Sequence, residues 1–578
     1  MEPPTARQFE ESFLSNDHLA PLSHENNNMV NNGRNANYSN INNDQSPPSI
    51  LKSILSSQDQ IIAMISNYST SYNVVSISIL IPILSSSTLN YAQYLTPASG
   101  SLVASSLIAG MIIGQLVGGA LGDLIGKKKA MMFVMTLQIL GCLGSSIFIS
   151  ETPLLFIFDG WNIFEQLGLW RFIVGLGCGG VYPLAAAMSS ESTKSSENDD
   201  DQHQENERDD HEAQAQMQVQ KLKMLATTFS TQGVGFVSVP IVGLSALLIL
   251  GENNMDIVWR FILFFGSIPG FILLILRFRA MHSRNIIQES EVLPLPQDDS
   301  DGNAEDLPSN NDEESRIESH ALEVEMASDS DSDDNNEEES ENIVEEESKQ
   351  SLLSAIRSEE NLLMKLIGTA GTWFLFDVVF YGNTLFQPVV IKTAFGYDDG
   401  DNANQDDEFA NIVDNIRDSM ILSIIALPGY FVSIALIGRR IFFKFTATPR
   451  FIQIQGFAIM ALLYLIIGIS WEHLTEHHWL LVLLYGNTFF FSNYGPNTTT
   501  FMLPSITFSE NCKSTLNGIS AAAGKAGALT GSLLFEPIAN KYGDGTVMML
   551  CAFTSVIAGI ITYFCTKPPK TRSIGVQL

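Results

Sequence analysis

The sequence predicts an all-α membrane protein with 12 transmembrane helices in two six-helix halves. The 578-residue chain contains twelve apolar runs, each near the length of about 20 residues that crosses a bilayer as a helix. The acidic residues that give the chain its net charge of −32 are concentrated in polar stretches between these runs. The longest polar stretch separates the sixth run from the seventh, which is typical of transporters built from two six-helix halves.

The apolar runs also set the predicted boundaries along the chain. The runs are 61–85, 98–121, 129–150, 162–187, 224–249, 258–279, 361–385, 419–437, 451–470, 479–503, 517–539 and 546–566. The predicted parts are a disordered N-terminal tail (1–59), a first half (60–279) with an acidic loop (189–222), a disordered acidic linker (280–360), a second half (361–566) and a C-terminal tail (567–578).

Composition excludes several other classes of protein. Residues 289–349 alone carry 24 acidic and two basic side chains, and such a charge repels nucleic-acid phosphates. The five cysteines are scattered, so no disulfide framework or cysteine zinc pair is expected. The sequence contains no nucleophile elbow, P-loop or dinucleotide fingerprint. We therefore expect no enzyme activity, no cofactor and no metal.

Basic residues close to the apolar runs predict the orientation in the membrane. Lys127–Lys129, Arg439 and Arg440 fall on the same side of a twelve-span bundle, as do the basic residues after the sixth and twelfth runs. Basic residues near spans favour the cytosolic side, so both termini are predicted to be cytosolic. The N-terminal tail lacks a secretory signal, and the plasma membrane is the default expectation.

A glycine-rich motif ends the second run and precedes the third. It reads Gly-Gly-Ala-Leu-Gly-Asp-Leu-Ile-Gly-Lys-Lys-Lys over residues 118–129, and it resembles the loop between helices two and three of the major facilitator superfamily. The glycines allow close helix packing, and Asp123 is placed to latch helix ends together. The alternative is an ordinary glycine-rich helix end with a basic flank.

Further segments resemble the phosphate:proton symporters of that superfamily, the plant and fungal type of inorganic phosphate transporter. The matching segments are Trp170–Leu184, Asp256–Arg260, Thr372–Gln387, Asn493–Phe501 and Asn517–Ala528. The resemblance implies a secondary transporter that moves inorganic phosphate, or a related anion, by alternating access. It implies protons as the coupling ion and the lipid bilayer as the surroundings. Sodium is the alternative coupling ion, and it would overturn this expectation.

Asp377 and Lys525 lie within otherwise apolar helices. Charges inside a bilayer are costly unless they face a cavity or a partner. Trp373, Asp377 and Tyr381 are spaced to share one helix face, and Tyr182 and Gln232 add neutral donors. Such a set could bind a protonated oxyanion, with Lys525 offsetting its charge and Asp377 accepting its hydrogens. A structural ion pair and helix-packing polar contacts are the alternatives.

The resemblance carries two groups of residues onto this chain. The substrate-binding candidates are Tyr182, Gln232, Trp373, Asp377, Tyr381, Asn497 and Lys525. The gating candidates are Gly122, Asp123, Gly126, Lys127 and Arg171.

The chain also departs from the family pattern. Val181 replaces an acid of the fourth helix, and Thr70 and Asn73 occupy the region where the family's first helix carries acids. Glu165 and Glu536 are predicted to be solvated near helix ends. Anion binding is therefore better supported than proton coupling. Two alternatives stay open: another cargo (an organic phosphate, a carboxylate or another oxyanion), or a transporter-like phosphate sensor that signals through the acidic linker.

Two other clusters are predicted to be solvated loops. His473, His477 and His478 have a spacing compatible with a metal site, although a loop is the simpler interpretation. The Ser-Asp run 328–334 is interpreted as linker, with phosphorylation as a secondary hypothesis.

Overall fold

A computed structural model describes most of the chain. The described residues are 48–90, 92–94, 96–150, 160–191, 207–276, 279, 351–395, 405–441 and 445–566. Ser49–Leu578 forms one compact unit, which contains all of the described residues except Pro48. The Ser-Asp run 328–334 and most of the predicted tails and linker lie outside the described residues.

All six predicted runs of the first half are helical. The elements are α2 (Pro48–Leu84), η1 (Ala92–Tyr94), α3 (Pro97–Leu121), the π-helical turn η2 (Gly122–Gly126), α4 (Lys127–Ile147), α5 (Ile163–Glu191), α6 (Glu207–Leu250), η5 (Glu252–Asn254) and α7 (Met255–Phe265). A turn at Gly266 and Ser267 follows α7, and residues 268–276 are again helical.

The six runs of the second half are helical as well. The elements are α11 (Leu362–Leu366), η6 (Ile367–Gly371), α12 (Thr372–Phe395), α13 (Gln405–Ala426), α14 (Pro428–Leu436), α15 (Pro449–Ile469), α16 (Trp471–Thr475), α17 (His478–Ser492), η7 (Asn493–Asn497), α18 (Thr498–Thr507), η8 (Glu510–Cys512), α19 (Lys513–Tyr542) and α20 (Asp544–Cys565). Two short antiparallel strands of two residues each, β1 (Arg440–Ile441) and β2 (Phe445–Thr446), lie between α14 and α15. The predicted all-α helical fold is confirmed.

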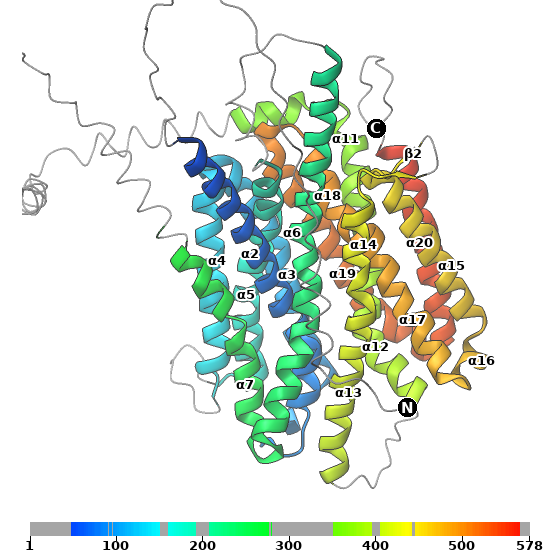
Figure 1. Ribbon diagram of the computed structural model, residues 1–578. Coiled ribbons are helices and arrows are strands. Elements are labelled where there is room, and N and C mark those ends of the chain that lie inside the picture. The colour runs from blue at the N-terminus through cyan, green and yellow to red at the C-terminus, as the bar shows by residue number, and fades with distance from the viewer. Residues whose placement is uncertain are drawn as a thin grey trace, which may run out of the picture. The chain divides into compact units, whose positions relative to one another are not determined.

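The helices of the first half gather on one side of the bundle and most of those of the second half on the other (Figure 1). Eight segments among the described residues are long and apolar enough to span a membrane. Together they cover nine of the twelve predicted runs, because one segment includes both the second and the third. The remaining three runs correspond to α2, to α17 with α18, and to α19, and polar residues interrupt each of them.

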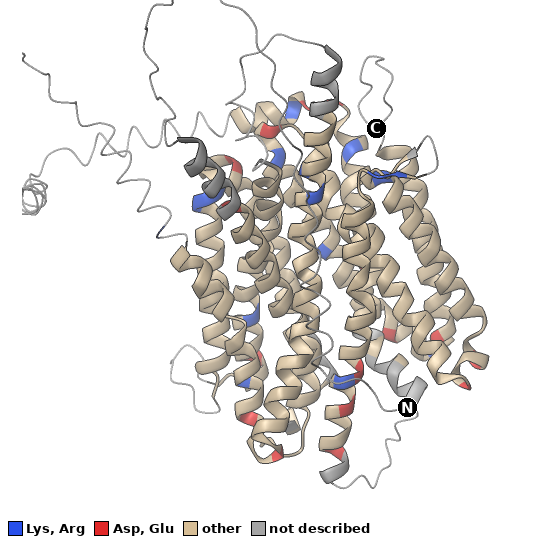
Figure 2. Cartoon of the chain, in the orientation of Figure 1, with Lys and Arg blue, Asp and Glu red and all other residues tan. Residues whose placement is uncertain are grey.

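Charged side chains concentrate at the two ends of the helices, with few between them (Figure 2). We call the end that carries Lys127–Lys129 and Arg439–Arg440 the basic end. We call the opposite end, where Glu408 and Asp414 lie near the start of α13, the acidic end. This separation is what a bilayer imposes, since charges at helix ends remain in water.

Glycines allow the first-half helices to pack backbone to backbone. A Cβ at Gly175 of α5 would lie 2.2 Å from the Leu107 carbonyl oxygen, and a Cβ at Gly114 of α3 would lie 2.2 Å from the Leu176 carbonyl oxygen. No real side chain tolerates such distances, so the contact between α3 and α5 requires glycine at both positions.

Three predicted boundaries shift in the structure. Helix α2 begins at Pro48, within the predicted tail, and α6 begins at Glu207, within the predicted acidic loop. Residues 351–358, at the end of the predicted disordered linker, are helical. These assignments of loop and disorder are wrong for the residues concerned, because hydropathy marks the membrane core and says nothing about polar helical extensions beyond it.

The helix at 351–358 is anchored against the basic end of the second half. Leu352, Ala355 and Ile356 pack on a cluster formed by Phe508, Cys512 and Leu516. The next acidic residue, Glu359, accepts hydrogen bonds from Ser509 Oγ (2.8 Å) and from Lys365. Burial acts to raise the pKa of Glu359, but these hydrogen bonds outweigh it and hold the pKa below its ordinary value.

Enlarging Gly175 tests the tight contact between α3 and α5. We expect Gly175→Ala to lower the free energy of unfolding by about 1–3 kcal/mol or more, because the added carbon displaces the Leu107 backbone. Gly559→Ala is the matched control, since its Cβ would lie at an ordinary 3.5 Å from Phe457. Thermal unfolding of both purified variants measures the difference, and equal midpoints would contradict the packing argument.

Candidate functional site

An ion pair lies inside the second half, between α12 and α19. Lys525 Nζ donates to Asp377 Oδ2 at 2.8 Å and to the Tyr381 hydroxyl at 2.9 Å. Lys525 is 3% and Asp377 1% exposed. The two charged residues that the sequence singled out within apolar runs are therefore direct partners. The pair is neutral overall, which makes its burial tolerable.

The local sequence of α19 explains how the two helices come so close. A Cβ at Gly524 would lie 2.5 Å from the Trp373 ring, and Cβ atoms at Gly527 and Gly531 would collide with backbone carbonyls of α12. Trp373 therefore covers the glycine face beside the ion pair. Glycine spacing on α19 thus sets the short distance between lysine and aspartate.

The first half contributes Tyr182 of α5 and Gln232 of α6 to the same region. The Tyr182 hydroxyl donates to Gln232 Oε1 at 3.4 Å. Lys525 Nζ lies 5.7 Å from the centre of the Tyr182 ring and 4.0 Å from that of Tyr381. The lysine is therefore within cation–π reach of aromatic rings from both halves.

Asn497 belongs to a second group of hydrogen-bonded side chains, which we call the Asn497 branch. Its Nδ2 donates to the Tyr430 hydroxyl at 2.9 Å and to Asn493 Oδ1 at 2.8 Å. Gly495 has a non-helical backbone, and the resulting kink between α17 and α18 places this amide inside the bundle. Tyr430 then stacks obliquely on Phe229 of the first half, with ring centres 6.0 Å apart.

Of the seven predicted binding residues, the structure brings three into one contact cluster and places the others beside it. Lys525 bonds to Asp377 and Tyr381, Trp373 packs against Gly524 next to the lysine, and Tyr182 with Gln232 faces the lysine across the interface between halves. Sequence reasoning missed Tyr430, which is fully buried and holds Asn497. No sequence pattern distinguishes a functional tyrosine in an apolar helix from one that only packs in the hydrophobic core.

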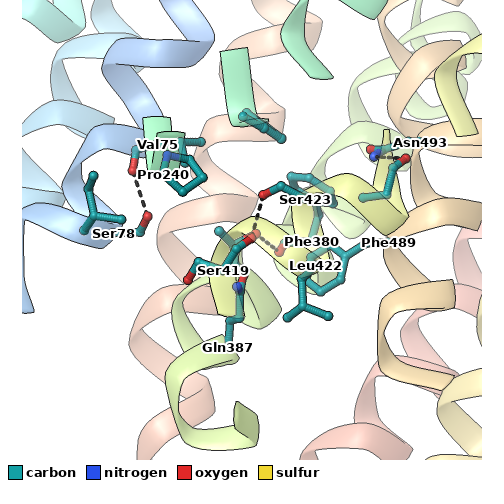
Figure 3. Close-up of a pocket in the computed structure, with 14 residues that line it drawn as sticks. Val75, Ser78, Pro240, Phe380, Gln387, Ser419, Leu422, Ser423, Phe489 and Asn493 are labelled. Atoms are coloured by element: carbon teal, nitrogen blue, oxygen red, sulfur yellow. Dashed lines mark hydrogen bonds between the residues drawn. The ribbon is translucent and has the colours of Figure 1, made fainter. Parts of the chain in front are cut away.

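A cavity opens between the halves next to this cluster (Figure 3). Its volume is about 50 Å³, enough for a few water molecules. The lining comes from α2, α6, α12, α13 and α17 and includes Ser78, Thr384, Gln387, Ser419 and Ser423, with Asn493 from η7. None of its lining residues is charged, and it contains none of the seven predicted binding residues.

Aromatic side chains separate the cavity from the ion pair. Phe380 and Phe489 line the cavity with ring centres 5.8 Å apart, and Phe380 also packs edge-on against Tyr381. The cavity reaches the Asn497 branch through Asn493. The cavity is thus lined by neutral residues, and Phe380 lies between it and Tyr381 of the charged cluster.

Asp123 connects the two halves at the basic end. Its carboxylate accepts hydrogen bonds from Ser514 N (3.2 Å), Thr515 N (2.7 Å) and Thr515 Oγ1 (2.7 Å). These groups belong to the first turn of α19, where free N–H groups and the helix dipole favour a carboxylate.

The other residues of the motif lie beside Asp123. Gly122 lies against Leu184 and Ser514, and Gly126 has a positive φ of 88° that a glycine adopts without strain. Lys127 begins α4 directly after it.

A second contact between the halves lies at the acidic end. The Glu408 carboxylate, from α13, accepts from the backbone N–H of Ser87 at 2.8 Å and from the Ser87 hydroxyl. Both ends of the interface are therefore bridged by a carboxylate in this structure.

Arg171 does not belong with the Asp123 motif. It lies eight residues into α5, counted from the acidic end, is fully buried, and donates to Ser76 Oγ at 3.2 Å and to the Asn73 carbonyl oxygen. Its partners are on α2 of the same half, so it does not take part in the contact between halves at Asp123, and its assignment as a gating residue stays a prediction.

The other acidic and histidine candidates occupy solvated positions. Glu165 is exposed and accepts from the backbone N–H of Asn162 at 2.9 Å, as a helix cap does. Glu536 is exposed on α19. Within the described ranges, no group of three or more His, Cys, Asp or Glu side chains could hold a metal. His473 lies within the short helix α16, His477 lies in the turn that follows it, and His478 begins α17; all three are exposed.

Comparison with known proteins decides the family. The family model of the Major Facilitator Superfamily matches residues 69–529. The chain belongs to the major facilitator superfamily. The solved structures that resemble it agree: the proton:xylose symporter XylE of E. coli has a TM-score of 0.57 at 16% identity, covering 89% of this chain and 96% of that one. The human organic anion transporter MFSD10 has a TM-score of 0.53 at 10% identity, covering 87% and 99%.

Curated relatives of this major facilitator protein carry more specific names. A low affinity inorganic phosphate transporter of Petunia hybrida is 27% identical over 548 residues, which cover 89% of this chain and 90% of the relative. A probable inorganic phosphate transporter of Arabidopsis thaliana is 26% identical, covering 80% of each chain. An inorganic phosphate transporter of Toxoplasma gondii is 25% identical, covering 90% of this chain and 74% of the relative. The resemblance to phosphate transporters seen in the motifs is confirmed.

Removing one member of the ion pair tests its stability role. We expect Lys525→Met or Asp377→Leu alone to lower the free energy of unfolding by about 3–5 kcal/mol, because each leaves a buried charge unpaired. The double variant should recover much of that loss. Thermal unfolding of the purified proteins measures this, with Glu536→Gln as the control. Equal losses in single and double variants would show that the charges do not stabilise each other.

Loss of the Asp123 carboxylate should loosen the basic end. Asp123→Ala removes an N-terminal cap worth about 1 kcal/mol, so the opened population should rise about five-fold. The alkylation rate of Cys512, which is buried next to this contact, reports the opening in a Cys565→Ser background. Asp123→Asn keeps one acceptor oxygen and should show a smaller increase. An unchanged rate in Asp123→Ala would contradict the latch.

Proposed function

We propose that this major facilitator protein carries inorganic phosphate across a membrane by alternating access, with Lys525, Asp377 and Tyr381 at the centre of the binding site. The observation that supports this most directly is the buried cluster of lysine, aspartate and tyrosine that faces Tyr182 of the other half. The names of the curated relatives point to the same cargo.

The chemistry of the cluster fits a partly protonated phosphate. Lys525 offsets the negative charge of the anion, and the Tyr381, Tyr182 and Trp373 side chains donate hydrogen bonds to its oxygens. Asp377 accepts from the hydroxyl groups of the anion. Because a fully deprotonated anion offers Asp377 no hydrogen, the site favours the protonated form.

Binding requires the anion to enter between groups that now bond to each other. Lys525 would exchange part of its contact with Asp377 for contact with phosphate, and Gln232 and Asn497 would orient it from the two halves. The carboxylate bridges at Asp123 and Glu408 would open alternately, so that the site meets one side of the membrane at a time.

Asp377 is also our candidate for carrying a coupled proton. The buried acidic side chains among the described residues are Asp377 and Asp418, and Val181, Thr70 and Asn73 occupy the positions where the family has acids. Asp418 lies with Arg417 at 3.0 Å, away from the cluster. A sodium-driven cycle is the alternative.

The orientation and location are proposed on the distribution of charge. The basic end would face the cytosol together with both termini, and the lipid bilayer would surround the exposed apolar side chains. The plasma membrane is the proposed location.

Uptake of labelled phosphate by proteoliposomes tests the function. We expect uptake by the unmodified protein and at least about a tenfold loss in Lys525→Ala and Asp377→Asn, since each removes a charged hydrogen-bond partner. Glu536→Gln, an exposed acid on the same helix as Lys525, is the matched control.

Three outcomes would revise the proposal. Normal uptake in both variants would refute the assignment of the site. Phosphate binding without flux would identify a sensor instead. Flux that ignores a pH gradient and follows a sodium gradient would exclude Asp377 as the carrier of a coupled proton.

A further inference from the structure

Arg171 is a buried cation with unused hydrogen-bond donors. It is 0% exposed and is among the largest fully buried side chains of the described residues. Its Nη2 donates to the Asn73 carbonyl oxygen and to Ser76 Oγ, whereas Nε and Nη1 have no partner. Nε carries one hydrogen and Nη1 two, so three of the five N–H groups of the guanidinium donate to nothing.

The polar neighbours of Arg171 are already committed to other bonds. Asn73 Nδ2 donates to the carbonyl oxygens of Ser69 and Gly266, both at 2.9 Å, and Asn73 Oδ1 accepts from Cys142 Sγ at 3.1 Å. The Tyr72 hydroxyl donates to the Ile262 carbonyl oxygen at 3.1 Å. None of these groups supplies a negative charge.

A carboxylate partner is also missing from the described part of the chain. Arg171 forms no ion pair there, and the two buried acids, Asp377 and Asp418, are both on helices of the second half. A guanidinium does not lose its proton in proteins, and an unpaired charge within a bilayer is costly. Water molecules could accept hydrogen bonds from the three free N–H groups, but they would leave the positive charge of Arg171 uncompensated.

We propose that Arg171 binds a small monovalent inorganic anion, of the halide class, in the first half between α2, α4 and α5. A halide needs only donors, which the three free N–H groups provide. A tetrahedral oxyanion is larger and presents up to four oxygens, more than the three free N–H groups can satisfy. This site is separate from the Lys525 cluster and does not depend on the proposed cargo.

Ser76 offers a matched pair of variants, because its hydroxyl already contacts the guanidinium. Ser76→Asp places a permanent carboxylate beside Arg171, which should replace the bound anion. Ser76→Asn has nearly the same size and no charge, so it should leave the anion site in use. Arg171→Gln removes the cation and with it the need for an anion.

The test compares thermal unfolding of the purified full chain in sodium chloride and in sodium gluconate at equal ionic strength, without phosphate. Chloride should raise the midpoint of the unmodified protein and of Ser76→Asn by a few degrees, because a ligand of the folded state stabilises it. Ser76→Asp should be as stable in gluconate as in chloride. Arg171→Gln, where it folds, should also lose the chloride effect.

Three further results would overturn the proposal. Equal midpoints of the unmodified protein in chloride and gluconate would show that water alone satisfies Arg171. Loss of the chloride effect in Lys525→Ala would place the anion at the other cluster. Phosphate should not replace chloride in the Lys525→Ala protein, and a rise as large as that with chloride would refute the halide assignment. Failed phosphate transport with an intact chloride effect would count against the proposed function alone.

Discussion

The hydrogen-bonded pair of Lys525 and Asp377 is the interaction on which the rest of the bundle depends. Neither charge could remain inside a bilayer alone, and the pair forms only because glycines on α19 let α12 approach within backbone contact. The pair is neutral, so the bundle can form without ligand. The pair could also open to admit an anion. The anion would then take over hydrogen bonds that one partner now makes, so that no charge is left without compensation.

The same helix carries both the ion pair and the contact at the basic end. Ser514 and Thr515 of α19 meet Asp123, and Lys525 follows Ser514 by eleven residues, which is about 17 Å along a helix. Both contacts are therefore held by one helix, and a tilt of α19 would move Lys525 and the partners of Asp123 together. Glu359 and the helix at 351–358 brace the loop just before this point.

The sequence predicted much of the fold because the bilayer imposes simple rules on it. Nine of the twelve apolar runs coincide with described segments that are long and apolar enough to span a membrane, and Asp377 and Lys525 stood out because charges are rare in such runs. Three kinds of feature escaped for physical reasons. The partners of Asp123 are mainly backbone N–H groups, which no residue pattern reveals. In the sequence Tyr430 cannot be told from a tyrosine of the hydrophobic core. Its role appears only in the structure, where its hydroxyl accepts a hydrogen bond from Asn497. The contact of Arg171 with Ser76 was not predicted, because a linear motif does not show which helix a side chain faces.

The two halves solve the problem of buried charge in different ways. The second half pairs its lysine with an aspartate, whereas the described first half holds Arg171 with carbonyl and hydroxyl oxygens. The anion proposed beside Arg171 would do for the first half what Asp377 does for Lys525, because it would compensate a buried cation. The difference is that Asp377 belongs to the chain, whereas the proposed anion would come from solution. Stability of the first half would then depend on the anions present, while the pair of the second half would not need them.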